Sequence, residues 1–315
     1  MGLVRDIGLP AFGFPVRVAG PLMRRSACFR IIAVSALIAL GAAPDKSLGA
    51  SPEAPAAAPP APPAVIYVFR AMGGKFVTPE MDKLVDKIEA RGLDVEVFNY
   101  TSWLRPAKEA VRRYKSETVK SPIIAVGHSA GGDSAIRFAL ALKRANVPVD
   151  LVVTLDPTRI ANRVPSNVER FVNIYISSHT LGGGAPSPAK DFQGNFASVN
   201  LKNYPNIWHL YMPRMAGLQD KMADKVAEVA AAPEASGGPS IPIEYAPPRD
   251  VPLELWDSGV AVVAAAGETA ATVAAQFGVP PWVIAEINKV EADSPLPAGR
   301  RLIVPRFLAP AAPAN

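Results

Sequence analysis

The chain has 315 residues and a formal charge of +5, from 33 Lys and Arg against 28 Asp and Glu. Most of the excess positive charge lies in residues 1–50, which hold six basic residues against two acidic ones. The rest of the chain is nearly neutral and lacks the broad basic surface that a phosphate backbone requires, which excludes nucleic acid as the main partner. A hydrophobic content of 49% is enough for a packed core and excludes a wholly disordered chain.

Proline is about twice as frequent as its usual share of roughly 5%, with 33 residues. Because proline fits poorly inside helices and central strands, this excess predicts linkers. Stretches rich in Pro, Ala, Gly and Ser divide the chain into parts. We expect, in chain order, a leader at 1–50, a Pro/Ala linker at 51–63, a large domain at 64–231, a Pro-rich linker at 232–258, a small domain at 259–306 and a tail at 307–315.

The leader has the order of a secretory signal, with arginines at 24, 25 and 30, an apolar run at 31–43 and then small residues. The run is shorter than the roughly 20 residues that cross a bilayer, which favours a cleaved signal peptide over a retained anchor or a core helix. Either Met1 or Met23 is the translation start. We expect a protein exported to the periplasm or cell envelope, in contact with the inner membrane only through an uncleaved leader. Cys28 is the only cysteine and lies in the leader, so the mature chain has no disulfide and no thiolate nucleophile.

Residues 64–231 alternate between strand and helix patterns. Apolar, β-branched runs predict strands, and apolar residues at helical spacing predict helices. The strands are expected at 64–70, 94–100, 121–128, 150–157 and 171–177, and the helices at 79–91, 106–117, 133–145 and about 213–231. This alternation predicts an α/β fold with a mostly parallel sheet covered on both faces, and a ligand site at the carboxyl ends of its strands.

The sequence GHSAGG at 127–132 lies between an expected strand and an expected helix. It matches the G-x-S-x-G pattern in the strand–turn–helix context that the pattern requires. Small residues around Ser129 permit a sharp turn that raises its hydroxyl from the sheet, and the following helix directs its N–H groups at the same place. We therefore interpret Ser129 as a nucleophile.

A serine nucleophile needs a histidine base and an orienting carboxylate. His209 is preferred over His179 as the base, since it comes after the expected strands and just before the last helix; His128 adjoins the nucleophile and is expected to pack. Asp156, at the end of the strand that follows the nucleophile helix, is the preferred carboxylate, and Asp191 is a weaker rival.

GHSAGG, LVVTLDP and NIWH, in this order, resemble the α/β-hydrolase family, and in particular its small exported members without a lid, which are lipase- or thioesterase-like. The resemblance covers about 64–231 and implies a minimal three-layer α/β-hydrolase fold with a Ser129–His209–Asp156 triad. It also implies an oxyanion hole from the N–H groups of Ala130 and of Ala71 or Met72. The chain departs from larger members, because it lacks their N-terminal strands, a cap insertion and the HG dipeptide of the early loop.

Residues 259–306 have a β-α-α-β pattern that resembles a LysM module. The matching features are the Gly267-Glu268-Thr269 turn, the helix end at 277–279, Asn288 and the segment 299–305; Ala270 replaces the usual aliphatic residue. The resemblance implies binding of N-acetylglucosamine glycans such as peptidoglycan beside Gly267, Glu268 and Thr269. The side chains of Trp282, Val283 and Ile287 are expected in the core.

Together these features predict an exported serine acyl hydrolase, acting on a small ester or thioester and tethered to peptidoglycan. Two alternatives stay open: a non-catalytic wall-binding protein with a degenerate hydrolase scaffold, and an esterase that removes O-acetyl groups from peptidoglycan. The sequence has no metal-ligand cluster and no dinucleotide fingerprint, so no metal and no cofactor are expected.

Overall fold

The computed structural model describes residues 63–307, apart from 77, 179 and 234–238. The expectations for the leader, for the first linker, for Cys28, for His179 and for nearly all of the tail therefore lie outside the described residues. Within the described part of the chain, no helix is both long enough and apolar enough to cross a membrane. All described residues belong to one compact unit.

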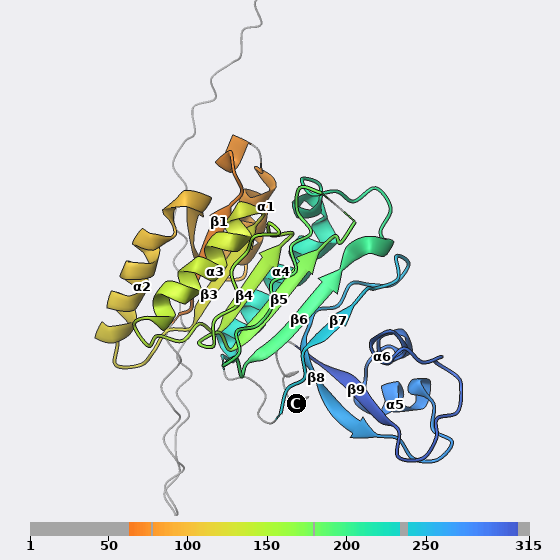
Figure 1. Cartoon of the computed structure of the whole chain (residues 1–315). Helices are drawn as coiled ribbons and strands as arrows, with labels where there is room; N and C mark the ends of the chain where they lie inside the picture. The colour runs from red at the N-terminus through yellow and green to blue at the C-terminus, as the bar shows by residue number, and fades with distance from the viewer. Residues whose placement is uncertain (1–62, 77, 179, 234–238, 308–315) are drawn as a thin grey trace, which may run out of the picture. The chain divides into compact units, whose positions relative to one another are not determined.

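A seven-stranded sheet with the order β2-β1-β3-β4-β5-β6-β7 forms the centre of the fold, and every neighbouring pair is parallel (Figure 1). The strands are β1 (Val65–Arg70), β2 (Asp94–Asn99), β3 (Ile123–His128), β4 (Leu151–Leu155), β5 (Arg170–Tyr175), β6 (Asn195–Asn200) and β7 (Ile243–Tyr245). The larger helices are α1 (Glu80–Glu89), α2 (Leu104–Ser116), α3 (Ala130–Lys143) and α4 (Ala216–Ala231). This architecture confirms the expected α/β class and its parallel sheet.

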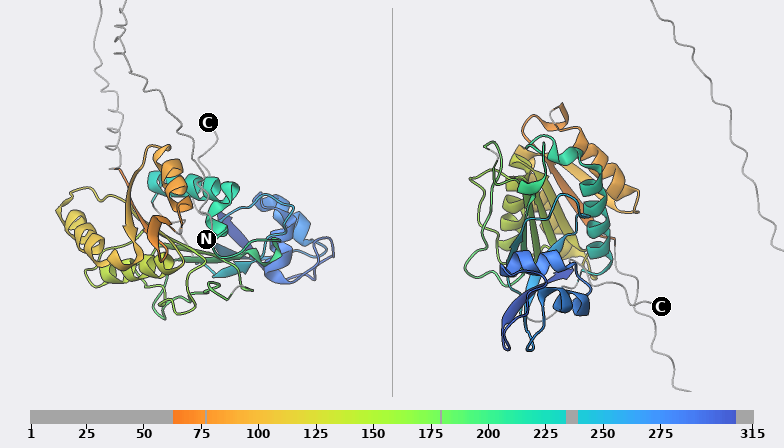
Figure 2. Two further views of the ribbon diagram at one scale, coloured as in Figure 1. Left: turned by 90° about the horizontal axis from the view of Figure 1, so that it is seen from above. Right: turned by 90° about the vertical axis from the view of Figure 1, so that its right-hand side faces the viewer.

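Helices cover both faces of the sheet, as the alternation of side chains along β1 shows. Ile66 and Val68 join the core formed with α1 and α4, whereas Tyr67 and Phe69 join the core formed with α2 and α3. Successive side chains of a strand point to opposite faces, so one apolar run serves two cores. Figure 2 shows α1 and α4 on one side of the sheet and α2 and α3 on the other.

The segment 232–258 differs from the expected linker. Ile243–Tyr245 form β7, which pairs with β6 and adds a seventh strand to the sheet. Tyr245 and Leu255 are buried. The prolines that predicted a spacer flank β7 instead of interrupting it, and an edge strand needs ladder hydrogen bonds on one side only. This part of the chain therefore does not hold the two domains apart.

The C-terminal module consists of β8 (Trp256–Val263), α5 (Ala270–Phe277), α6 (Pro281–Asn288) and β9 (Arg301–Phe307), with β8 and β9 antiparallel. Local signals account for its helix ends. Thr269 and Thr272 form a reciprocal capping box at the start of α5, Gly278 ends this helix with φ 64°, and Pro281 opens α6.

The module packs on the β5–β7 side of the sheet through a buried polar network. The guanidinium of Arg170 on β5 faces the carboxylate of Asp257 on β8, with 3.6 Å between Nε and Oδ2, and Asn195 on β6 donates to the same carboxylate. Arg306 on β9 donates in turn to Asn195. Burial raises the pKa of Asp257 to about 6 in spite of the two nearby arginines. The network joins the α/β domain to the C-terminal module.

Candidate active site

Ser129 occupies a sharp turn between β3 and α3, with φ 55° and ψ −127°. The turn depends on its two glycine neighbours. A Cβ on Gly127 would lie 2.1 Å from the carbonyl oxygen of Gly131, and a Cβ on Gly131 would lie 2.1 Å from that of Phe69. Only glycine fits such close backbone approaches. The strained conformation lifts the Ser129 side chain from the strand, as expected for a nucleophile.

His209 lies between Ser129 and Asp156. Its Nε2 is 2.8 Å from the Ser129 hydroxyl, and its Nδ1 is 2.7 Å from Oδ2 of Asp156. With the proton on Nδ1 donated to the carboxylate, Nε2 is left to accept the hydroxyl proton. The structure thus brings together the three side chains selected from the sequence, although 53 and 80 residues separate His209 from its two partners.

The Asp156 carboxylate is completely buried and is held by two backbone donors. Its Oδ1 accepts from the N–H groups of Ile176, at 3.0 Å, and of Gly183, at 2.7 Å, which leaves Oδ2 directed at His209. Asp156 itself has φ 43°, an uncommon conformation that turns its side chain away from the strand direction. Buried donors of this kind keep a carboxylate oriented beside a histidine.

The glycine loop at 182–184 packs against the acid and the histidine, a role that the sequence patterns did not predict. A Cβ on Gly182 would lie 2.1 Å from Oδ2 of Asp156 and 2.5 Å from Nδ1 of His209, and a Cβ on Gly184 would lie 2.2 Å from the Thr158 carbonyl oxygen. The amide of Asn173 on β5 fixes this loop by donating to the Gly184 carbonyl at 3.0 Å. The run of three glycines after a strand indicated a loop with close backbone contacts. The sequence does not show that Asp156 is the residue contacted, because the two segments meet only in the folded chain.

His128 is fully buried against His209, with 4.9 Å between the ring centroids. Its Nε2 donates to the His209 backbone carbonyl at 3.0 Å, and its Nδ1 has no hydrogen-bond partner among the described residues. Burial, and secondarily the nearby His209, lowers the pKa of His128 to about 4. The ring is therefore neutral at pH 7 and braces the backbone of the histidine loop, which fits the packing role expected for it.

The candidate oxyanion donors follow the carboxyl ends of β1 and β3, at the same edge of the sheet as Ser129. Ala130 is the first residue of α3, where backbone N–H groups lack intrahelical partners. Ala71 directly follows β1, and the approach of Gly131 to the Phe69 carbonyl places the start of α3 against the end of that strand. Ala71 is buried, whereas the side chain of its alternative, Met72, is exposed.

Asp191, the weaker candidate for the carboxylate, lies elsewhere. Its side chain accepts from Lys143 and Ser166 on the surface, and these bonds lower its pKa. Within the described ranges, no three His, Cys, Asp or Glu side chains are placed to hold a metal ion.

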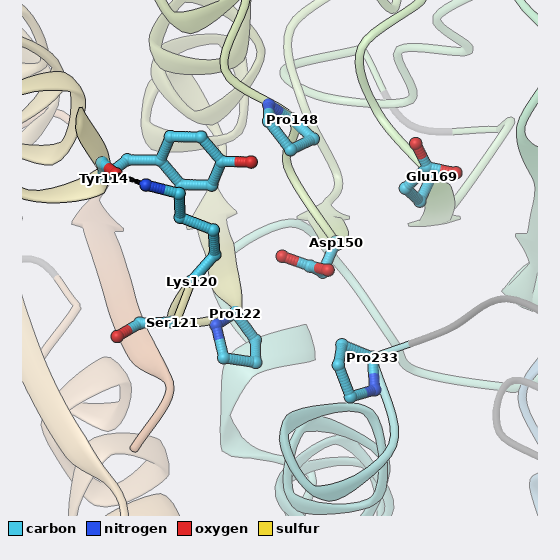
Figure 3. A pocket seen from close by; sticks show the side chains of 8 residues that line it. All are labelled: Tyr114, Lys120, Ser121, Pro122, Pro148, Asp150, Glu169 and Pro233. Atoms are coloured by element: carbon cyan, nitrogen blue, oxygen red, sulfur yellow. Dashed lines mark hydrogen bonds between the residues drawn. The ribbon is translucent and has the colours of Figure 1, made fainter. Parts of the chain in front are cut away.

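A hollow of about 530 Å³ lies at the amino ends of β3 and β4, at the opposite edge of the sheet from the triad. Figure 3 shows the side chains that line it. Lys120 and Asp150 line it, and Asp150 accepts from the N–H of Ile123 at the amino end of β3. Ser129 follows the carboxyl end of the same strand, so this hollow is not the site of its substrate. A second hollow of about 530 Å³ lies at the carboxyl ends of β1 and β2 and is lined by Arg70, Gly73, Gly74, Phe76, Asn99, Tyr100 and Thr101.

In the C-terminal module, Gly267, Glu268 and Thr269 form the turn before α5. Glu268 accepts from the Ala265 N–H and from the Gln276 amide, which lowers the pKa of its carboxyl. The turn also exchanges backbone hydrogen bonds with Leu296, so it is joined to the loop after α6. These contacts give the turn a fixed shape beside that loop.

Comparison with known proteins identifies the C-terminal module. Residues 263–305 match the LysM domain family. The C-terminal module is therefore a LysM domain, and the turn at Gly267, Glu268 and Thr269 and Asn288 lie inside the matched residues.

A search of curated proteins finds no relative of the chain. Among solved structures, the chain is similar to a candidate hydrolase of the alpha/beta superfamily from Xanthomonas campestris pv. campestris, with 15% identity and a TM-score of 0.28. The match covers 41% of this chain and 77% of that one.

Proposed function

We propose that the protein is a serine acyl hydrolase in which Ser129 is the nucleophile, His209 the general base and acid, and Asp156 the residue that orients His209. The observation that carries this proposal is the buried chain of two short hydrogen bonds, 2.7 and 2.8 Å long, that links the three side chains. The arrangement fits the roles that nucleophilic acyl transfer requires.

The reaction follows from these positions. His209 Nε2 takes the proton of Ser129 while the hydroxyl oxygen attacks the substrate carbonyl, and the N–H groups of Ala130 and Ala71 stabilise the oxyanion. His209 then gives the proton to the leaving oxygen or sulfur, and an acyl ester of Ser129 remains. A water molecule deprotonated by His209 hydrolyses this ester and restores the serine.

The LysM domain supports a second part of the proposal, which is attachment to N-acetylglucosamine glycans such as peptidoglycan through the turn at Gly267, Glu268 and Thr269. This attachment and the expected signal peptide both support a location of the hydrolase in the cell envelope. The junction through Asp257 and Arg170 implies that the glycan-binding domain holds the hydrolase directly, without a flexible tether.

The catalytic proposal is tested with a fluorophosphonate probe on the full chain. We expect labelling of the wild-type protein and its loss in the Ser129→Ala variant, while Ser134→Ala, altered in the same helix, remains labelled. Equal labelling of wild type and Ser129→Ala, or no labelling of a folded protein, would refute the proposal. Such an outcome would favour a non-catalytic scaffold.

The glycan proposal is tested separately by sedimentation of the full chain with purified peptidoglycan. We expect retention of wild type and of Ser129→Ala alike, because the binding turn lies in the other domain. A chain that stays in the supernatant would show that the LysM domain does not attach it to this polymer.

A further inference from the structure

The carboxyl edge of the sheet carries an unusual share of the exposed apolar side chains. In the described part of the chain ten large apolar side chains are exposed, and six of them lie in the loops that follow β1, β4, β5 and β6. They are Met72, Phe76, Ile160, Leu181, Trp208 and Tyr211. Single exposed apolar residues need no explanation, but a group around one site indicates contact with an apolar ligand.

Four of the six lie on the side of Ser129 where the acid and the histidine are. Leu181 precedes Gly182, whose backbone abuts both the Asp156 carboxylate and the His209 ring. Trp208 precedes His209, and the Tyr211 N–H donates to the Trp208 carbonyl at 2.8 Å, which keeps the two aromatic residues in one turn. Ile160 lies in the loop after β4, which begins with Asp156. We call Ile160, Leu181, Trp208 and Tyr211 the histidine-side rim.

The other side of Ser129 is different in character. The hollow at the ends of β1 and β2 is bounded by the polar side chains of Arg70, Asn99 and Thr101, together with two glycines, Tyr100 and Phe76. Arg70 is fixed there by its ion pair with Asp82. Phe76 is the exposed large apolar side chain of this lining, so a long alkyl chain placed in the hollow would also meet the polar side chains and the glycine backbone.

The chemistry of the triad distinguishes the two sides. The leaving oxygen must come within hydrogen-bond distance of His209 Nε2 to receive its proton, so the alcohol lies along the histidine side. The acyl substituent leaves the same carbonyl carbon in another direction, so it does not lie along the histidine side. We infer that the substrate is an ester of an apolar alcohol with a short acyl group, and that the histidine-side rim binds the alcohol. This inference rests on the proposed hydrolase activity.

Isomeric esters test the inference without a difference in overall composition. Octyl acetate and ethyl octanoate have the same formula, as do hexyl acetate and ethyl hexanoate, and their hydrolysis by the full chain can be followed by acid release at constant pH. We expect kcat/KM to be about tenfold higher for octyl acetate than for ethyl octanoate, because only the octyl alcohol removes rim surface from water. Equal values, or a preference for ethyl octanoate, would overturn the assignment.

Variants locate the effect. Leu181→Ser and Ile160→Ser remove apolar surface from the rim and are expected to reduce the ratio of the two kcat/KM values several-fold. Val119→Ser, an exposed apolar residue in the loop before β3 at the opposite edge, is the matched control and is expected to leave the ratio unchanged. A ratio that falls equally in the control would contradict a role for the rim. Fluorophosphonate labelling of each variant keeps this question separate from the hydrolase proposal: a labelled enzyme without the isomer preference refutes only the rim.

Discussion

At the scale of single residues, the candidate site concentrates backbone strain. Ser129 and Asp156 both have positive φ, at 55° and 43°, although neither is glycine. Such conformations cost about 1–3 kcal/mol each and persist where the surrounding contacts enforce them. Here they place the hydroxyl and the carboxylate at opposite ends of one imidazole, and the glycine loop supplies the space that this arrangement needs.

Replacing Gly182 with alanine tests that space. The new Cβ would lie 2.1 Å from Oδ2 of Asp156, so the carboxylate or His209 must shift, and a displacement of about 1 Å can lower kcat about 100-fold. Gly217→Ala is the control, because a Cβ there meets no atom within 4 Å. Steady-state hydrolysis and circular dichroism would report the effect; a folded Gly182→Ala variant with full activity would contradict the assigned contact.

His128 predicts a pH dependence of stability. Its folded pKa of about 4 lies below the usual value of about 6.5, so the unfolded chain binds a proton first as the pH falls. The neutral ring's contribution to the free energy of unfolding is complete above about pH 6.5 and decreases as the pH falls to 4. The loss over this range is about 3 kcal/mol.

The His128→Gln variant keeps a donor for the His209 carbonyl but cannot take up this proton. Urea unfolding at pH 7 and pH 4 should therefore show a smaller loss of unfolding free energy in the variant than in wild type. Parallel losses in the two proteins would mean that His128 is not held neutral by burial.

At the scale of elements, four strands meet around one buried carboxylate. Asp257 on β8 faces Arg170 on β5, and Asn195 on β6 links Asp257 to Arg306 on β9. The free-energy cost of desolvating such a pair offsets most of the Coulomb attraction between the two charges, so the pair adds little net stability. Loss of one partner is nevertheless costly, because the other charge stays buried.

We expect Asp257→Ala to lower the free energy of unfolding by about 3 kcal/mol. The matched surface control is Asp250→Ala, whose carboxylate pairs with Arg249 in the solvent and is expected to contribute about 0–1 kcal/mol. Denaturant titration of the three proteins measures both values. A cost for Asp257→Ala no larger than that of the control would show that the junction network is not buried in solution.

At the scale of the whole molecule, one apolar core runs from the sheet into the LysM domain. It includes Ile243 and Tyr245 of β7, Trp256 of β8 and Val283 of α6. The rings of Tyr245, Trp256 and Trp282 contact one another across the junction, with centroids 5.0 to 6.3 Å apart. Because the core is continuous, the two domains are expected to share their stability.

The full chain should therefore unfold in a single transition. Tryptophan fluorescence, which includes Trp256 and Trp282 at the junction, and far-ultraviolet circular dichroism, which follows mainly the α/β domain, should give coincident denaturation curves. Two separate midpoints would contradict a shared core and restore the picture of independent domains joined by a linker.

The sequence by itself determined the elements of local origin. Apolar periodicity located β1 to β5 and the helices α1 to α4, but not β6, whose sequence NFASVN has a weaker apolar pattern. The glycines around Ser129 marked the turn, and chain order selected His209 and Asp156 from few candidates. The LysM domain was also evident, because its turn, caps and helix ends are encoded within short segments. In each case the physical cause lies in neighbouring residues, where propensity and spacing act directly.

Only the tertiary structure decided the contacts between distant segments. The loop at Gly182 packs on Asp156, β7 joins the sheet within a stretch that its prolines marked as a spacer, and Arg306 reaches Asn195 across 111 residues. Such contacts depend on where the sheet brings separate strand ends together, and no local pattern records that geometry. The apolar rim beside His209 belongs to the same class, because its side chains come from three loops that meet only once the sheet has formed.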